Sequence, residues 1–352
     1  MKNHNADGRA PAKATSFDIA FLAGVSQPTV SRALRGNPRV REETRRRVQA
    51  IAQKLNYKVD KNASNLRCRR SSTLALLFFE DPTPDDSQIN PFFHSMLGSI
   101  TRACARSGYD LLISFQQQSG NWHEDYEDTH KADGLILLGY GDYLKYRERL
   151  ERLVEQGTHF VLWGAVQSGQ PGLSVGSDNY QGSYDATRHL LNLGRRNIAF
   201  LGTASSQYPE FFARYQGYTR ALQDAGIVVD GRLQVDAITT ERCGYMAAGE
   251  LLNRGQPFDG IIAASDLIGI GAMHALQERR IDVPGQVSIV GFDDIPAATL
   301  SNPPLTTVAQ DTKLAGEVLV ATVLRRVRNE PAEAKMLQTR LVVRQSCGAR
   351  GA

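Results

Sequence analysis

The sequence predicts an α/β protein made of a small all-α head and two doubly wound parallel-sheet lobes, and two observations carry this prediction. Residues 15–58 contain three short helical patterns and no strand pattern. From residue 73 onward, short apolar runs alternate with helical patterns in two series. Such alternation gives parallel sheets with helices on both faces. At 352 residues, the chain has room for a head and two lobes of this kind.

The middle of the head is typical of the turn and second helix of a helix-turn-helix motif. Gly24 gives a tight turn the conformational freedom it needs, and Ser26 and Pro28 suit the start of the next helix. The helical spacing predicts an inward-facing stripe, formed by Val30, Ala33 and Leu34. Polar side chains that can bond to base edges and phosphates lie toward the other side, namely Gln27, Thr29, Ser31 and Arg32. The same pattern also fits a short helix whose polar face is only solvated.

The flanks of this motif favour a DNA-binding module. A helix over residues 16–22 is expected to turn its apolar face inward, with Phe17, Ile19, Ala20 and Ala23. A third helix over residues 42–55 is expected to bury Val48, Ile51, Ala52 and Leu55 and to present arginines outward. Residues 1–70 hold 16 Lys and Arg against 5 Asp and Glu, whereas residues 71–352 hold 25 against 32. A basic tail that binds nothing is the alternative, but the helical periodicity argues against it.

The stretch TSFDIAFLAGVSQPTVSRALRGNPRVREETRRRVQAIAQKLNY resembles the head of the LacI/GalR family of transcriptional regulators. The resemblance continues through the hinge and most of the remaining chain. It implies a homodimer that binds a double-stranded DNA operator, with base or phosphate contacts from Ser26, Gln27, Pro28, Thr29, Ser31, Arg32 and Asn37. It also implies a body of the periplasmic-binding-protein type, which binds a small-molecule effector between two lobes.

Residues 59–72 are expected to form the hinge, and residues 1–14 a disordered tail. Residues 60–70 are too few and too polar to make a stable helix alone. The resemblance implies that this segment orders beside its dimer mate in the minor groove, where Leu66 wedges between base pairs and kinks the duplex. The family usually has a proline where Val59 stands. A plain linker with one stray leucine is the alternative.

The body is expected to span residues 73–352. Its first series has strands at 74–79, 109–115, 134–138 and 160–163 and helices at 92–107 and 144–156. Its second series has helices at 182–193, 214–225, 244–253 and 268–277 and strands at 197–202, 235–237, 260–263 and 288–291. A helix at 314–328 and one strand at 335–343 follow. We expect lobe 1 to comprise about 73–175 and 305–335, and lobe 2 about 176–303 and 336–350.

Ligands of doubly wound sheets bind beyond the carboxyl ends of the strands, so residues there are candidates. Arg214 and Asp293 match the arginine and aspartate with which the family grips its effector. Asp178 and Asp266 occupy similar strand ends, although each aspartate could instead cap a helix or form a salt bridge between lobes. The aromatic candidates are Phe92, Tyr140 and Trp163. The family's stacking aromatic is replaced here by Thr239.

Several function classes are disfavoured. The sequence has no GxxxxGK[ST], HExxH or GxGxxG motif, so we expect no enzyme and no cofactor. The 4 cysteines are scattered, so we expect no metal site. No run of about 18 apolar residues is present, and we expect no membrane span. The first residues contain no apolar export signal, so we expect a cytoplasmic protein.

The resemblance implies a repressor that an inducer releases from DNA, and a sugar or oligosaccharide is the expected effector. A regulator of non-sugar metabolism that an effector such as a nucleobase activates as co-repressor is the alternative. A solute-binding protein fits less well, because such a protein would have an export signal and no basic head.

Overall fold

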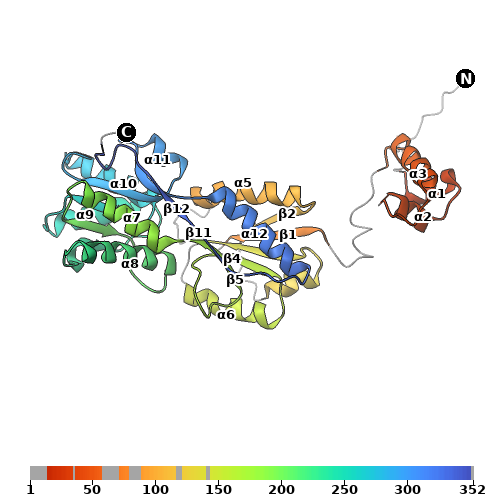
Figure 1. Cartoon of the computed structure of the whole chain (residues 1–352), viewed down its shortest axis with the longest axis horizontal. Helices are drawn as coiled ribbons and strands as arrows, with labels where there is room; N and C mark the ends of the chain where they lie inside the picture. The colour runs from red at the N-terminus through yellow and green to blue at the C-terminus, as the bar shows by residue number, and fades with distance from the viewer. Residues whose placement is uncertain are drawn as a thin grey trace, which may run out of the picture. The chain divides into compact units, whose positions relative to one another are not determined.

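The computed structural model describes residues 14–34, 36–57, 71–78, 89–115, 121–139 and 143–349 (Figure 1). The chain divides into two compact units, Met1–Ser71 and Ser72–Ala352, and each is described by itself. Two of the candidate residues, Leu66 and Tyr140, lie outside the described residues.

The head is a three-helix unit formed by α1 (Ser16–Ala23), α2 (Gln27–Leu34) and α3 (Glu42–Lys54). Thr15 begins α1 with a capping box, in which its hydroxyl accepts from the Asp18 amide and Asp18 accepts from the Thr15 amide. The helix ends at Gly24, whose φ of 60° is left-handed and favours glycine.

The core of the head contains the expected stripe residues Val30 and Ala33. Phe17, which we expected to be buried, is instead 71% exposed. The buried face of α1 is set by Ile19, Ala20 and Ala23, and a residue two positions before Ile19 points to the opposite side of a helix.

The first lobe of the body is built on a six-stranded parallel sheet in the order β11-β5-β4-β3-β1-β2. Its strands are β1 (Thr73–Phe78), β2 (Asp110–Phe115), β3 (Gly134–Leu138), β4 (Phe160–Trp163), β5 (Leu173–Ser177) and β11 (Lys335–Leu337). Helices α5 (Pro91–Arg106) and α12 (Thr312–Val327) pack on one face, and α6 (Tyr143–Glu155) packs on the other. A short π-helix spans Glu124–Asp128.

The second lobe is built on a six-stranded sheet in the order β12-β10-β9-β8-β6-β7. Its strands are β6 (Ile198–Leu201), β7 (Gln234–Val235), β8 (Gly260–Ala263), β9 (Ser288–Asp293), β10 (Thr306–Gln310) and β12 (Thr339–Val342). Its helices are α7 (Asn179–Asn192), α8 (Pro209–Asp224), α9 (Glu241–Asn253), α10 (Asp266–Glu278) and α11 (Pro296–Leu300), with a 3-10 turn at Gly231–Leu233. Helices α7 and α8 pack together, as do α9 and α10 (Figure 1).

The chain crosses between the lobes after β5, after β10 and between β11 and β12. Two expectations from the sequence were wrong here. The single strand expected at 335–343 is split at Gln338, so that β11 pairs with β5 of the first sheet and β12 pairs with β10 of the second. Residues 306–310, which we expected in lobe 1, form β10 in the sheet of lobe 2. Strand patterns look alike in both lobes, and only pairing decides to which sheet a strand belongs.

No helix among the described residues is long and apolar enough to cross a membrane.

Candidate functional site

The polar face of α2 lies at the surface of the head. Pro28 and Arg32 are exposed, whereas Thr29 and Ser31 are half-buried. The buried face of the same helix is apolar, with Val30 inside the three-helix core. The head therefore presents the side chains that we expected to contact DNA outward and holds the helix in place from its other side.

The start of α2 is fixed by short polar contacts. The Gln27 side-chain amide donates to the Ser16 hydroxyl at 3.2 Å, which ties α2 to the first turn of α1. The hydroxyls of Ser26 and Thr29 are 2.9 Å apart. Ser26, which suits the start of this helix, thus uses its hydroxyl for the contact with Thr29, and its carbonyl accepts from the Thr29 and Val30 amides.

Asn37 orders the loop that follows α2. Its backbone amide donates to the Arg32 carbonyl at 3.0 Å, and its side-chain oxygen accepts from the Arg39 amide at 2.9 Å. The α3 helix then begins with Glu42, which pairs with Arg46 at 3.0 Å. The position of Arg32 is thus set by bonds from both ends of its helix.

Arg214 lies on α8, in lobe 2, and is 1% exposed. Its Nε donates to Asn179 Oδ1 at 2.8 Å, and its Nη1 donates to the Ala264 carbonyl. The guanidinium carbon lies 3.8 Å from the centre of the Phe292 ring, and Nη1 lies 3.6 Å from Asp293 Oδ1. Strand ends and helix starts of lobe 2 therefore hold one buried cation in a fixed orientation.

Asp293 is the partner of this cation. It ends β9, is 3% exposed, and has a left-handed φ of 119°, which is strained for a residue with a side chain. The Gln310 side-chain amide donates to its Oδ1 at 2.7 Å. Burial raises the pKa of Asp293 to about 7, although Arg214 and Gln310 act to lower it. Such a carboxyl can both accept from and donate to a ligand hydroxyl near neutral pH.

Two further candidate aspartates have structural partners. One oxygen of Asp266 accepts from the Ile295 amide at 2.8 Å, and the other accepts from the Thr307 hydroxyl. Burial, followed by the nearby charge of Asp293, raises the pKa of Asp266 well above its usual range. Asp178 caps α7 by accepting from the Gln181 amide at 3.0 Å. Asp178 thus takes the helix-capping role that the sequence left open as an alternative, and the ligand roles of both aspartates stay predictions.

The aromatic candidates of lobe 1 lie together. Phe92, on α5, is 1% exposed, and Trp163, at the end of β4, is 2% exposed. Their ring centres are 5.9 Å apart. Thr239, which stands where the family has an aromatic, is buried.

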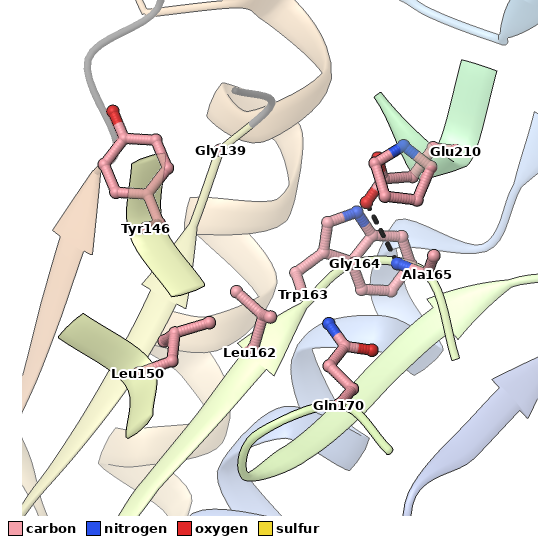
Figure 2. A pocket seen from close by; sticks show the side chains of 10 residues that line it. Gly139, Tyr146, Leu150, Leu162, Trp163, Gly164, Ala165, Gln170 and Glu210 are labelled. Carbon is pink, nitrogen blue, oxygen red and sulfur yellow. Dashed lines mark hydrogen bonds between the residues drawn. The ribbon is translucent and has the colours of Figure 1, made fainter. Parts of the chain in front are cut away.

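Two cavities adjoin these residues. The larger, of about 490 Å³, is bordered by Phe92 of lobe 1, Asp293 and Gln310 of lobe 2, and Lys313 and Arg340 beside the crossovers. That volume is in the range of small-molecule sites. The smaller, of about 30 Å³, is shown in Figure 2, with Trp163 and Gln170 from lobe 1 and Glu210 from lobe 2.

Three residues of this site were not among the candidates predicted from the sequence. Gln310 bonds to Asp293, Asn179 bonds to Arg214, and Glu210 reaches from α8 to lobe 1. Gln310 was assigned to the wrong lobe, which hid its place beside Asp293. Asn179 directly follows Asp178, and its position at a strand end was the available signal. Nothing in the sequence near Glu210 indicated a contact with the other lobe.

Comparisons with known proteins bear on both units. Residues 17–60 match the model described as "Bacterial regulatory proteins, lacI family", and residues 187–347 match that of a "Periplasmic binding protein-like domain". The chain is 31% identical over 343 residues to the HTH-type transcriptional regulator DegA of Bacillus subtilis, covering 95% of this chain and 98% of DegA. The chain belongs to the LacI family of bacterial regulators. The predicted family, fold class and regulatory rather than enzymatic function are thereby confirmed.

Other LacI-family proteins are similar over nearly the whole chain. CelR of Thermobifida fusca is 31% identical over 336 residues, which is 93% of this chain and 96% of CelR. A structure described as a complex of the regulator CelR with cellobiose is 29% identical, with a TM-score of 0.70 over 95% of this chain and 99% of that one. A lac repressor dimer bound to operator has a TM-score of 0.80 over 96% and 99% of the chains, and at 23% identity it shows a shared fold.

Proposed function

We propose that this LacI-family regulator is a cytoplasmic homodimer that places α2 of each subunit in the major groove of an operator and represses transcription. A carbohydrate bound between the lobes releases it. The observation that carries the proposal is that one chain has both an outward polar face on α2 and, in the body, a buried Arg214–Asp293 pair beside a cavity of about 490 Å³. We assign residues 15–58 to DNA binding, 59–72 to the hinge and 73–352 to the effector.

The residues of the head take distinct parts in this proposal. Arg32, which is exposed, contacts a base edge, since a guanidinium can bond two acceptors of a guanine at once. Thr29 and Ser31 bond phosphates or bases, while Gln27 and Pro28 restrict which bases are tolerated. Leu66, outside the described residues, is proposed to kink the centre of the site.

A carbohydrate suits the cleft for two physical reasons. Asp293 and Gln310 offer acceptors and a donor beside the Arg214 guanidinium, and neighbouring sugar hydroxyls need both. Phe92, from the opposite lobe, borders the same cavity of about 490 Å³ and supplies an apolar ring there. The similarity to a regulator described in complex with cellobiose supports the same ligand class.

The head is tested by selecting DNA sites from a random pool with the full chain at one fixed salt concentration. Arg32→Ala should lose discrimination at the base pair it contacts by about 1–3 kcal/mol. Arg46→Ala, which removes an exposed arginine of α3, is the matched control and should leave the selected sequence unchanged. An Arg32→Ala protein that selects the wild-type site would remove Arg32 from base reading.

The cleft is tested by a thermal-shift screen against mono- and oligosaccharides, with nucleobases as the competing class. A ligand that binds only the folded body raises the melting temperature. The ligand found should also release wild-type protein from its selected DNA. A nucleobase that raises the melting temperature and strengthens DNA binding would overturn both the proposed ligand and the proposed sign.

A further inference from the structure

Glu210 joins the two lobes directly. It lies in the first turn of α8, in lobe 2, and one oxygen of its carboxylate accepts from the Ala165 amide at 2.9 Å. Ala165 follows β4 in lobe 1, as Figure 2 shows. A Cβ at Gly164 would lie 3.1 Å from the same oxygen, so the missing side chain there lets the carboxylate come close.

This contact depends on how the lobes stand to each other. The adjoining cavity of about 30 Å³ is lined by Trp163 and Gln170 from lobe 1 and by Pro209 and Glu210 from lobe 2. It has room for a water molecule but not for a ligand of sugar size. A hydrogen bond is lost once donor and acceptor part beyond about 3.5 Å, so a small separation of the lobes breaks the bond to Ala165.

We infer that Glu210 is a latch whose carboxyl holds the cleft closed by bonding Ala165 of the opposite lobe. Because the Glu210 carboxyl lies in the contact between the closed lobes, closing of the cleft also favours the uptake of a proton by Glu210. That this affects DNA binding rests on the proposed function, whereas the latch itself does not.

The direction of the proton link follows from burial. Burial raises the pKa of Glu210, and the bonds from its own amide and from Ala165 and the charge of Arg214 oppose this without cancelling it. Among the residues that the structure describes, the charged or titratable groups on this side of the carboxyl are Arg214 of α8 and the Tyr146 phenol of α6, which borders the cavity. Opening the cleft hydrates the carboxyl and returns its pKa toward the usual value. The closed form therefore binds the proton more tightly, and acidification favours closing.

The latch is tested by amide hydrogen exchange at residue resolution on the full chain, without DNA or ligand, between about pH 5 and pH 8. Protection of the Ala165 amide is measured relative to intrinsic exchange at each pH. The Gly164 amide is the internal reference, because it donates to the Val175 carbonyl within lobe 1. Glu241→Gln, in the first turn of α9, is the matched control for loss of a lobe 2 carboxylate.

In the wild type, protection of Ala165 should fall as the pH rises, while that of Gly164 stays constant. Glu210→Gln keeps an oxygen that accepts but cannot ionise, so it should protect Ala165 equally at every pH. Glu210→Ala should lower the protection of Ala165 about tenfold. Glu241→Gln should behave as the wild type.

Two results would overturn the inference. Unchanged protection of Ala165 in Glu210→Ala would show that the bond does not hold the lobes. The same pH dependence in wild type and Glu210→Gln would assign the proton to another carboxyl, such as Asp293 or Asp266. Because the measurement uses neither DNA nor ligand, either failure leaves the proposed function standing, and a failed DNA selection leaves the latch standing.

Discussion

The head and the cleft hold their functional side chains in opposite ways. On α2 of the head, Arg32 is exposed and stands on a helix whose other face is already packed. In the body, Arg214 and Asp293 are 1% and 3% exposed and bond to the protein around them. The difference teaches that the head can change its polar residues at little cost in folding, whereas each change in the cleft alters stability as well as the site.

The two regions can be followed separately in one sample. Both tryptophans of the chain, Trp122 and Trp163, lie in the body, so tryptophan fluorescence reports unfolding of the body alone. Far-ultraviolet circular dichroism reports helices of both units. A transition seen by dichroism and not by fluorescence therefore belongs to the head.

The largest effect is expected from Arg214→Ala. The change leaves the Asp293 carboxylate buried without its cation and the Asn179 side-chain oxygen without its donor. Removing one partner of a buried pair costs about 3–5 kcal/mol of unfolding free energy. Urea denaturation followed by tryptophan fluorescence measures it. Arg220→Ala, on the same helix with its side chain 59% exposed, is the control and should change little. Equal losses in the two variants would contradict a buried, interlocked cleft.

A second effect, of comparable size, is expected from pH on the body. The pKa of Asp293 is about 7 in the folded protein and lower when unfolded, so the folded state binds the extra proton. The contribution of Asp293 to the unfolding free energy is fully present at pH values below its unfolded pKa. This contribution is lost as the pH rises to about 7, by at most about 1.4 kcal/mol per pH unit. The unfolding free energy of wild type minus that of Asp293→Asn should show this slope. A flat difference between pH 4 and 7 would argue against it.

The head should respond to acid with the opposite sign. The bonds from the Thr15 amide and hydroxyl lower the pKa of Asp18. A lowered pKa gives stability that is present above the unfolded pKa and is lost as the pH falls through the folded one. The unfolding transition of the head, followed by dichroism, should therefore move to lower urea concentration on acidification below about pH 4. Asp18→Asn, which has no such titration, is the comparison.

The smallest effect is expected from Thr15→Ala, which removes the cap of α1. Loss of an N-cap hydroxyl costs about 1 kcal/mol, and it should appear only in the transition of the head. The fluorescence transition of the body should not move. A shift of both transitions together would mean that the head and the body unfold as one unit.

Much of the fold could be predicted because its signals are local. The spacing of Val30 and Ala33 fixed the orientation of α2, and the alternation of strands and helices predicted both lobes. Arg214 and Asp293 were found as candidates through the family resemblance, and the structure brings them within 3.6 Å of each other. Phe17 was misplaced because a short helix can turn either of two overlapping apolar stripes inward.

The amino-acid sequence by itself determined the basic three-helix head, the two series of strands and helices, and the family. Only the tertiary structure decided that β10 and β11 belong to different sheets, that Gln310 meets Asp293, and that Glu210 meets Ala165 of the other lobe. Periodicity indicates which face of one element is apolar, and it depends only on residues that are close together in the chain. A contact between residues far apart in the chain depends on how whole elements pack, which no local pattern records.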